Sequence, residues 1–383
     1  MDREDYILML PGPTDVPEQA LAAMARRMIN HRGEEFRRLH GEVIEKLRKV
    51  LGATSGEVFV LTCSSTGGIE FAVSNLIDRN DRVLAFVNGL FAERMTVAAE
   101  YYSDRVVRVE DELGTSVTPE RFRSEVESRD GVDVALLVHN ETSTGAFNPY
   151  VPEIAEYCRR NGILLIVDGV TSIGGYPLEA SGWGLASFVG GTQKCLAAPP
   201  GLAIVYVSDE ARERARRKPK RPHYFDLLTH EEFMKRLETP FTPAISLFYA
   251  LDASLDYMLE RGLERWYSAH RQGSAAFYEA LEGMGLSVFP RDPFRSRTLI
   301  AARLPAGVQD AQLTKVMKER HGVHIAGGMG RTKGLIFRIG NMGMVTPERV
   351  RRTLRALSAS LEELGVRTNR VDVDGVVERA FAG

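Results

Sequence analysis

The chain has 383 residues, of which 44% are hydrophobic and 26% are charged, and its formal net charge is −2. This length predicts two domains rather than one hydrophobic core, and the balanced charge argues against a nucleic acid or an anionic membrane surface as partner. The three cysteines, Cys63, Cys158 and Cys195, lack metal-ligand spacing, so we expect no disulfide framework, no metal site and a reducing compartment.

The N-terminal sequence, MDREDYILML, starts with acidic residues and carries only a short apolar run, which argues against a signal peptide. No apolar stretch approaches the ~20 residues that a membrane-spanning helix needs. We therefore expect a cytoplasmic protein. The first predicted elements are two amphipathic helices, Val16–Met28 and Glu34–Leu51.

Short apolar runs then alternate with helical patterns. The runs are Val58–Thr62, Arg82–Phe86, Val106–Val109, Val134–Val138, Ile163–Val167, Ser187–Val189 and Leu202–Val207. Consecutive apolar positions are typical of strands buried on both faces, and the alternation predicts an α/β fold with a mostly parallel seven-stranded sheet flanked by helices. Such sheets bind ligands at the carboxyl ends of their strands.

The remaining chain predicts a smaller α+β domain. A basic run, Arg212–Arg221, is typical of a solvated helix end. The later predicted elements are the helices Ala244–Glu260, Glu264–Met284, Gln309–Arg320 and Thr346–Leu364, and the strands Ser287–Phe289, Leu299–Arg303, Val323–Ala326 and Ile336–Ile339. We expect residues 1–260 to form an N-terminal segment plus the large domain and residues 261–383 the small domain, ending in an alternating tail packed on the surface.

Two candidate functional residues follow strands of the predicted sheet. Asp168 ends the run ILLIVD, where a buried carboxylate needs a donor or cationic partner; it suits either a helix N-cap or a partner for a protonated ring nitrogen. Lys194 follows a strand and the Gly190-Gly191 turn, with no carboxylate nearby in the sequence. A lysine there is commonly a solvated surface residue, but partial desolvation would lower its pKa and free a nucleophilic amine.

Two further signals are ambiguous alone. The loop Thr62–Gly68 presents hydroxyl and glycine residues before a predicted helix, which suits a phosphate seat or plain N-capping. Arg338 interrupts an apolar strand, and it is either a clamp for a substrate carboxylate or an edge-strand residue on a solvated face.

The order of these signals, together with eight motifs, resembles the class V aminotransferases of pyridoxal phosphate (PLP) fold type I. The similarity is to the alanine–glyoxylate, serine–glyoxylate and serine–pyruvate group and its archaeal relatives, and it runs from Leu8 to about Leu364. The motifs are LPGPTDVP (10–17), NHRGEEF (30–36), CSSTGGIE (63–70), VNGLF (87–91), HNETSTG (139–145), VDGVTSIGG (167–175), GGTQKCLAAPPG (190–201) and FRIGNMG (337–343).

The resemblance implies a role for each matching residue. Lys194 would hold the cofactor as a Schiff base and move protons, and Asp168 would pair with the pyridine nitrogen. The other implied cofactor contacts are Phe91 and Val170 on the two ring faces, Thr142 near the phenolic oxygen, Ser65, Thr66, Gly67 and Gln193 at the phosphate, and Thr242 at a neighbouring subunit's phosphate. Arg338 would bind the α-carboxylate, helped by the backbone near Gly12. A homodimer with shared active sites is implied.

The resemblance predicts ping-pong transfer of the amino group of a small L-amino acid, alanine or serine, to glyoxylate or pyruvate. Aspartate or phosphoserine with 2-oxoglutarate is the alternative, and it needs a second cation, for which Arg32, Arg331 and Lys333 are candidates. A cysteine desulfurase is disfavoured because no cysteine follows Cys195 and because Gln193 stands where desulfurases have histidine. A non-catalytic subunit of the same fold stays open as another class, although Lys194 and Asp168 are both present.

Overall fold

The larger part of the molecule is built on one sheet. The structure, a computed structural model, describes residues 6–383; residues 1–5, which entered the prediction about a signal peptide, lie outside the described residues. The strands are β2 (Glu57–Thr62), β3 (Arg82–Val87), β4 (Arg105–Glu110), β5 (Val134–Val138), β8 (Leu164–Asp168), β9 (Ser187–Gly191) and β10 (Leu202–Val207). They form a seven-stranded sheet in the order β2-β10-β9-β8-β5-β3-β4.

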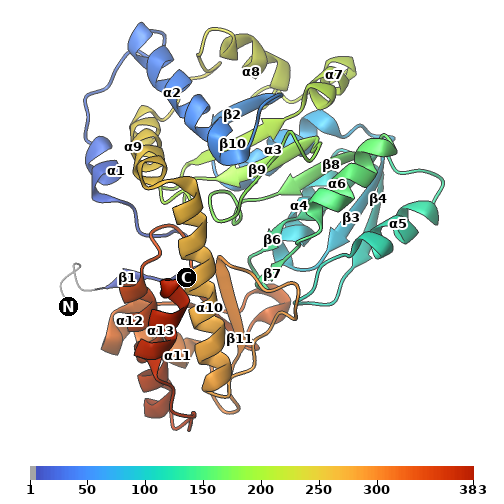
Figure 1. The fold of residues 1–383 in the computed structure, drawn as a ribbon. Helices are drawn as coiled ribbons and strands as arrows, with labels where there is room; N and C mark the ends of the chain where they lie inside the picture. Colours follow the sequence, from blue (N-terminus) through green and yellow to red (C-terminus); the bar gives the residue numbers. More distant parts are fainter. Residues whose placement is uncertain (1–5) are drawn as a thin grey trace.

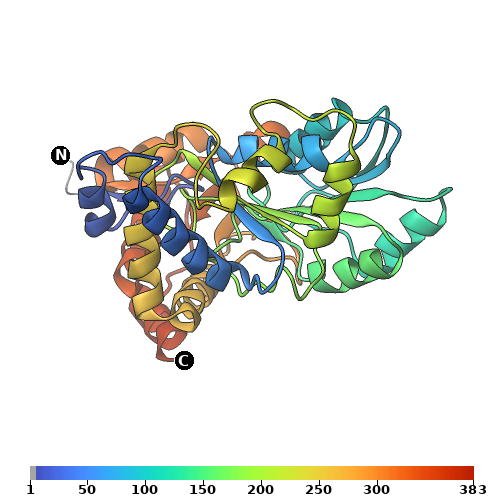
Figure 2. The same ribbon diagram turned by 90° about the horizontal axis from the view of Figure 1, so that it is seen from above.

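β10 runs antiparallel to both of its neighbours, β2 and β9, and the other six strands share one direction, which confirms the predicted mostly parallel arrangement. All the other strands therefore end at the same edge. Helices cover both faces: in Figure 2, α3 and α4 lie on one side of the sheet, and α2 and α6 on the other. The helices of this part are α1 (Glu18–Ala23), α2 (Glu34–Leu51), α3 (Ser65–Leu76), α4 (Leu90–Glu100), α5 (Pro119–Glu127), α6 (Val151–Arg160), α7 (Asp209–Arg217), α8 (Leu227–Met234) and α9 (Ile245–Arg261).

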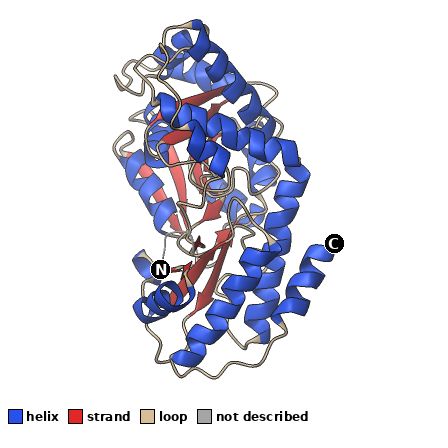
Figure 3. Ribbon diagram, turned by 90° about the vertical axis from the view of Figure 1, so that its left-hand side faces the viewer, coloured by secondary structure: helices blue, strands red, loops and turns tan. Residues whose placement is uncertain are grey.

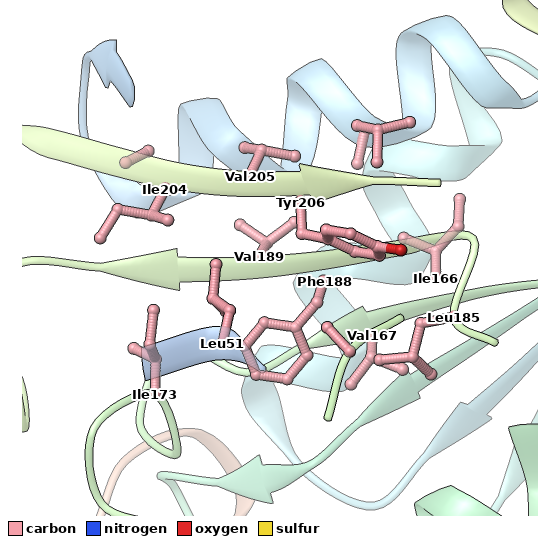
Figure 4. Packing of buried hydrophobic residues seen from close by; sticks show 14 of the residues in the cluster. Leu51, Ile166, Val167, Ile173, Leu185, Phe188, Val189, Ile204, Val205 and Tyr206 are labelled. Atoms are coloured by element: carbon pink, nitrogen blue, oxygen red, sulfur yellow. The ribbon is translucent and has the colours of Figure 1, made fainter. Parts of the chain in front are cut away.

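The centre of the sheet is closely packed. Tyr206 pairs with Phe188 across the β10–β9 ladder, and both side chains are fully buried (Figure 4). Val205 and Val189 pair one residue further along. Burying a large apolar side chain stabilises a fold by ~1.5–3 kcal/mol, so these contacts hold β9 and β10 together, and β8 pairs with β9 on the other side. The residues at the ends of these strands therefore occupy fixed positions.

A second, smaller core involves mainly the C-terminal part of the chain. A three-stranded sheet has the order β11-β14-β13, with β11 (Leu299–Arg303), β13 (Ala326–Gly327) and β14 (Ile336–Gly340). The helices α10 (Leu263–Gly283), α11 (Asp310–His321), α12 (Pro347–Glu363) and α13 (Val373–Ala382) lie around it (Figures 1 and 3). The N-terminal strand β1 (Ile7–Leu8) pairs with β12 (Val323–His324), and Met9 belongs to this second core. The expected domain boundary, between residues 260 and 261, falls at the last residue of α9, just before α10, and it stays a prediction.

Several expected elements differ from those observed. The helix predicted over Val16–Met28 is only α1, because Pro17 stands at its N-terminus and turns follow Ala23. The strand predicted at Ser287–Phe289 is reduced to one isolated bridge at Val288; Pro290, which lacks an N–H donor, follows directly. The single strand predicted over Val323–Ala326 is split into β12 and β13, which pair with different strands.

The alternating C-terminal segment was predicted as a surface tail, and this is wrong. It forms α13, whose residues Val376 and Val377 are buried in the second core. The side chain of Asp372 accepts a hydrogen bond from the Gly375 N–H and so starts the helix. The spacing of the valines is therefore that of one helix face rather than of a strand.

The basic run forms the end of α7. Arg214 pairs with Asp81, and Arg212 and Arg216 both pair with Glu231. These arginines act as local ion-pair partners on the surface. Among residues 6–383 we find no helix that combines the length and the apolar character of a membrane span.

Candidate active site

One cavity lies at the sheet edge where the parallel strands end. It is lined by Ser64, Ser65, Thr66, Ile69, Phe91, Arg94, Met95, Ala98, Val138, Asn140, Thr142, Asp168, Val170, Gln193 and Lys194. These residues follow β2, β3, β5, β8 and β9, so segments far apart in sequence meet here because their strands are parallel. The structure thus brings together most of the residues that the sequence singled out.

Asp168 is the last residue of β8 and is buried. Its Oδ1 accepts a hydrogen bond of 2.9 Å from the Val170 N–H. Burial raises the pKa of this carboxyl to about 7, and the charge of Glu141 raises it further, while the Val170 N–H and Lys194 act in the opposite direction. A cation facing Asp168 would favour the ionised form. The N-cap alternative is not observed, since Asp168 precedes no helix in this structure.

Lys194 lies in the turn after β9 and is also buried. Its Nζ donates to the carbonyl of Pro11. A Cβ added at Gly12 would lie 2.5 Å from Nζ and 2.6 Å from Cδ of the lysine, so only glycine allows this approach. Burial lowers the pKa of the Lys194 amine to about 8, assisted by the charge of Arg338. A buried amine with a lowered pKa is a nucleophile near neutral pH.

The N-terminus of α3 forms one end of the cavity. The Ser64 side chain makes no capping hydrogen bond, so plain capping does not explain the hydroxyl residues of this loop. Within residues 6–383, the N–H groups of Ser65 and Thr66 have no backbone partner. Gln193 Nε2 donates to Ser65 Oγ over 3.3 Å, while the buried Gln193 Oε1 has no partner among the described residues. Free donors at a helix N-terminus suit a phosphate group.

Phe91, Val170 and Thr142 line the middle of the cavity. Phe91 is the second residue of α4, and Val170 follows Asp168 in the turn after β8. The Thr142 hydroxyl donates to Thr171 Oγ1 over 3.2 Å. An aromatic ring and an aliphatic side chain in one narrow cavity suit the two faces of a flat heterocycle.

Arg338 lies in β14, the central strand of the small sheet, so it is not the edge-strand residue that the sequence left open. Its Nε donates to the carbonyl of Gly327 over 2.8 Å, and its Nη1 donates to the carbonyl of Thr142 over 3.0 Å. Burial lowers the pKa of this guanidinium to about 10. No ion pair to Arg338 forms within residues 6–383, although the side chain is buried. The charge of Glu141 acts on the guanidinium without an ion pair, and a carboxylate ligand would supply a directly bonded counter-charge.

Four predicted site residues are not part of the cavity lining. Gly12 and Arg338 contact lining residues, at Lys194 and Thr142 respectively, whereas Gly67 and Thr242 are directed elsewhere. The Gly67 N–H donates to the Ser64 carbonyl over 2.8 Å, and a Cβ on Gly67 would face Cys63 and Phe225. Thr242 is exposed, in a segment whose carbonyls at Thr239 and Pro240 accept hydrogen bonds from Arg32. Thr242 is not among the residues that line the cavity.

Three residues of the site were missed from the sequence. Asn140 lines the cavity, with its buried Oδ1 unpartnered in the described part of the chain. Arg94 lines the same cavity one turn after Phe91, and Glu141 is fully buried behind Phe91. In the motif HNETSTG, Asn140 and Glu141 lie close behind a predicted buried strand, and this position could have marked them as candidate site residues. The sequence did not mark Arg94 as a site residue, because arginines are common on the solvent-facing side of amphipathic helices.

These residues fit PLP. A buried amine with a lowered pKa suits its aldehyde, a buried carboxylate suits its pyridine nitrogen, and the free donors at α3 suit its phosphate. The N–H groups of Ser65 and Thr66 and the guanidinium of Arg338 are donors that a phosphate and a carboxylate would satisfy.

Comparisons with known proteins agree with this arrangement. The family model described as aminotransferase class-V matches residues 17–354. An uncharacterized aminotransferase of Methanocaldococcus jannaschii is 37% identical over 98% of this chain and 97% of its own length. Serine–glyoxylate aminotransferase of Methylorubrum extorquens is 31% identical over 94% of this chain and 92% of its own length.

The crystal structure of ureidoglycine–glyoxylate aminotransferase from Bacillus subtilis is 28% identical and superposes with a TM-score of 0.91, covering 99% of this chain and 98% of that chain. The fold and the family model thus give the same result along nearly the whole length. The chain belongs to the class V aminotransferases, enzymes of PLP fold type I, and its cofactor is pyridoxal phosphate.

Proposed function

We propose that this enzyme transfers the amino group of a small L-amino acid, alanine or serine, to glyoxylate or pyruvate. The observation that carries the proposal is the placing of Lys194 and Asp168 in one cavity, with the unpaired Arg338 joined to its lining at Thr142. This arrangement offers an amine, a buried acid and a carboxylate-binding cation, which together suit transamination of an α-amino acid.

Bound PLP supplies an aldehyde that condenses with amines and a protonated ring that accepts the electrons released at the α-carbon of the substrate. In our proposal Lys194 links to the aldehyde, and Asp168 keeps the ring nitrogen protonated. The N–H groups of Ser65 and Thr66, with the Gln193 side chain, hold the phosphate. Phe91 and Val170 cover the ring faces, and Thr142 lies near the phenolic oxygen.

The proton transfers fall to Lys194. With a pKa lowered to about 8 by burial, its Nζ is partly neutral near pH 7 and can take the proton from the α-carbon of the donor. Gly12 leaves the space in which the long side chain swings, because a Cβ there would collide with it. Nζ then holds the proton until it is returned, and the same group serves the second half of the reaction in reverse.

Arg338 binds the α-carboxylate, the group that every amino donor and 2-oxo acceptor shares. A small donor side chain needs no charged partner, and it suits the apolar part of the lining, which includes Ile69, Met95 and Ala98. Two of the relatives named above support glyoxylate as the acceptor. The proteins from Methylorubrum extorquens and Bacillus subtilis are named for different donors, serine and ureidoglycine, but both are named as glyoxylate aminotransferases.

A panel of amino donors tested against glyoxylate, pyruvate and 2-oxoglutarate checks the proposal. We expect alanine or serine with glyoxylate or pyruvate to give the highest kcat/KM and parallel double-reciprocal lines, as in ping-pong kinetics. Intersecting lines, or a strong preference for 2-oxoglutarate, would contradict it.

An acidic donor such as aspartate is a second candidate, and one observation favours it. Arg94 is exposed at the cavity and forms no ion pair within residues 6–383. By contrast, the cations expected from the sequence are occupied or remote from the cavity: Arg32 bonds Glu238, and Arg331 bonds Glu110 over 3.0 Å. Replacing Arg94 by methionine would lower activity with aspartate and leave activity with alanine unchanged if this candidate is right.

We also propose a cytoplasmic homodimer with shared active sites. Thr242 would contact the phosphate held by the other subunit. Support comes from the exposed apolar side chains beside its segment, where Tyr224 is 45% exposed and stacks on Phe241. Light scattering tests the dimer, and an active monomer would contradict the role of Thr242.

A further inference from the structure

The N-terminus of α4 is capped by residues from another part of the chain. The N-cap residue of this helix is Gly89, which has no side chain to accept a hydrogen bond. Glu141 Oε2 instead accepts from the N–H groups of Phe91 and Ala92, over 3.1 and 3.0 Å. Ser143 Oγ accepts from the Leu90 N–H over 2.9 Å. Three N–H groups that a helix leaves free are thus satisfied from β6 (Asn140–Glu141) and the residues after it.

The carboxylate is itself held in place. Glu141 Oε1 accepts from the Ser143 N–H over 2.8 Å and from the Ser143 hydroxyl over 2.6 Å. A Cβ on Gly89 would lie 2.4 Å from Glu141 Cγ, so the approach requires glycine at that position. Glu141 is fully buried, and the positive end of a helix dipole is a favourable place for a buried carboxylate.

Residues 141–143 also contact the substrate side of the cavity. Thr142, between the two capping residues, accepts the hydrogen bond from Arg338 Nη1 at its carbonyl. The carbonyl of Ser143 accepts from the Thr332 hydroxyl over 3.0 Å, in the loop that leads to β14. Residues 141–143 therefore join the helix that carries Phe91 to the strand that carries Arg338.

We propose that Glu141 is a positioning residue of the active site, which fixes the Phe91 ring over the cofactor by capping α4. Glu141 does not line the cavity. In this proposal it acts through the backbone of the helix, in addition to the effect of its charge on the pKa of Asp168. The inference rests on the proposed function only in taking Phe91 as the residue that covers the cofactor ring.

Glu141→Gln tests the proposal most directly. The amide keeps one acceptor for the Phe91 and Ala92 N–H groups but places an NH₂ group against the Ser143 N–H, so the bonded arrangement is lost. Because hydrogen bonds to charged groups are the stronger ones, we expect the dissociation constant of PLP from the apoprotein to rise about tenfold. The visible circular dichroism per molecule of bound PLP should become weaker as well, because this signal depends on how rigidly the protein holds the cofactor ring.

A double-mutant cycle with Phe91→Leu separates positioning from general stability. If Glu141 acts through the Phe91 ring, Glu141→Gln should change the PLP dissociation constant in the natural chain and have almost no effect in the Phe91→Leu background. An equal change in both backgrounds, or no change in either, would overturn the proposal.

Two further variants guard against a folding defect. Ser143→Ala removes the hydroxyl that accepts from the Leu90 N–H and donates to Glu141 Oε1, and we expect the same pattern with a smaller change. Ser208→Ala is the matched control, because it removes the side-chain cap of α7, whose Ser208 Oγ accepts from Ala211 N over 3.1 Å far from the cavity lining. It should lower the melting temperature and leave PLP binding unchanged.

If the double-mutant cycle shows coupling between Glu141 and Phe91 but the donor panel shows no transamination of alanine or serine, only the proposed substrates are rejected. If the enzyme transaminates small donors but the effects of Glu141→Gln and Phe91→Leu on the PLP dissociation constant are independent, only the role of Glu141 is rejected. Loss of PLP binding in Ser208→Ala equal to that in Glu141→Gln would also contradict the inference, since any lost helix cap would then have the same effect.

Discussion

The two sides of the active site are built in different ways. On the cofactor side, Asp168 and Lys194 lie directly after β8 and β9, and the seven-stranded sheet holds them. On the substrate side, Arg338 belongs to the small sheet, where its Nε donates to the carbonyl of Gly327, and its Nη1 reaches the cavity lining at the carbonyl of Thr142. The first side rests on neighbouring strands of one sheet, and the second on contacts between segments nearly 200 residues apart.

This difference suggests a division of labour. The cofactor side carries the chemistry that all donors share, and its geometry follows from strand order alone. The substrate side is joined through single hydrogen bonds between distant segments, so small changes in loops can alter it without disturbing the sheet. Substitutions on the two sides should therefore separate loss of chemistry from loss of substrate binding.

The largest effect is expected from Lys194→Ala. Removing the amine removes both the covalent link and the group that moves the α-proton, so kcat should fall by at least about 10³-fold. Single-turnover absorbance measurements with alanine check this. Activity within tenfold of the natural enzyme would show that the cofactor side does not depend on Lys194.

Asp168→Asn should come next. The amide leaves the ring nitrogen without its counter-charge, and we expect kcat to fall about a hundredfold with little change in the KM for the donor. Asp168→Glu is the control, since it keeps the charge. A rise in KM with unchanged kcat would place Asp168 on the substrate side instead.

Arg338→Lys should have a smaller effect, confined to the substrate. A lysine cannot form the two parallel hydrogen bonds of a guanidinium, so the donor KM should rise about tenfold while the PLP dissociation constant stays constant. Arg331→Lys is the matched control, because Arg331 is an exposed arginine paired with Glu110. Weakened PLP binding in Arg338→Lys would show that the two sides are not separable.

The smallest effect is a pH dependence of cofactor capture by the apoprotein. Burial lowers the pKa of Lys194 to about 8, and only the neutral amine reacts with the aldehyde. The neutral fraction therefore grows about fivefold between pH 7 and pH 8, and the capture rate should level off above pH 8. Stopped-flow absorbance measures it, with an exposed model amine as control. A rate that still climbs beyond pH 10 would indicate an unperturbed lysine.

The same contrast explains what the sequence could predict. Apolar runs and the residues that follow them predicted the seven-stranded sheet, and they pointed to Asp168 and Lys194 through a local pattern. The N-terminus of α3 was equally visible in CSSTGGIE, although the pattern could not separate a cap from a phosphate seat. The structure favours the phosphate seat because the Ser64 side chain makes no cap.

Contacts between distant segments were not predictable in this way. Glu141 caps α4 because the N-cap residue of that helix, Gly89, has no side chain. The two segments meet only in the folded chain, so this contact leaves no sign in the sequence. Helix α13 has a similar cause, since it depends on what the small core can bury. The shortened strand at Ser287–Phe289 has a local cause instead, because Pro290 follows it directly. Thr242 stays a prediction, because its expected contact is with another subunit.

The central claim is that Lys194 is the lysine that binds the cofactor, and trapping tests it most directly. Two lysines are buried within residues 6–383, Lys194 and Lys218; Nζ of Lys218 donates to the carbonyls of Ser74 and Ile77 outside the cavity. Borohydride reduction of the PLP-bound enzyme, followed by peptide mass spectrometry, should place the pyridoxyl group on Lys194 alone. Label on Lys218, or no label on the peptide that contains Lys194, would contradict the account.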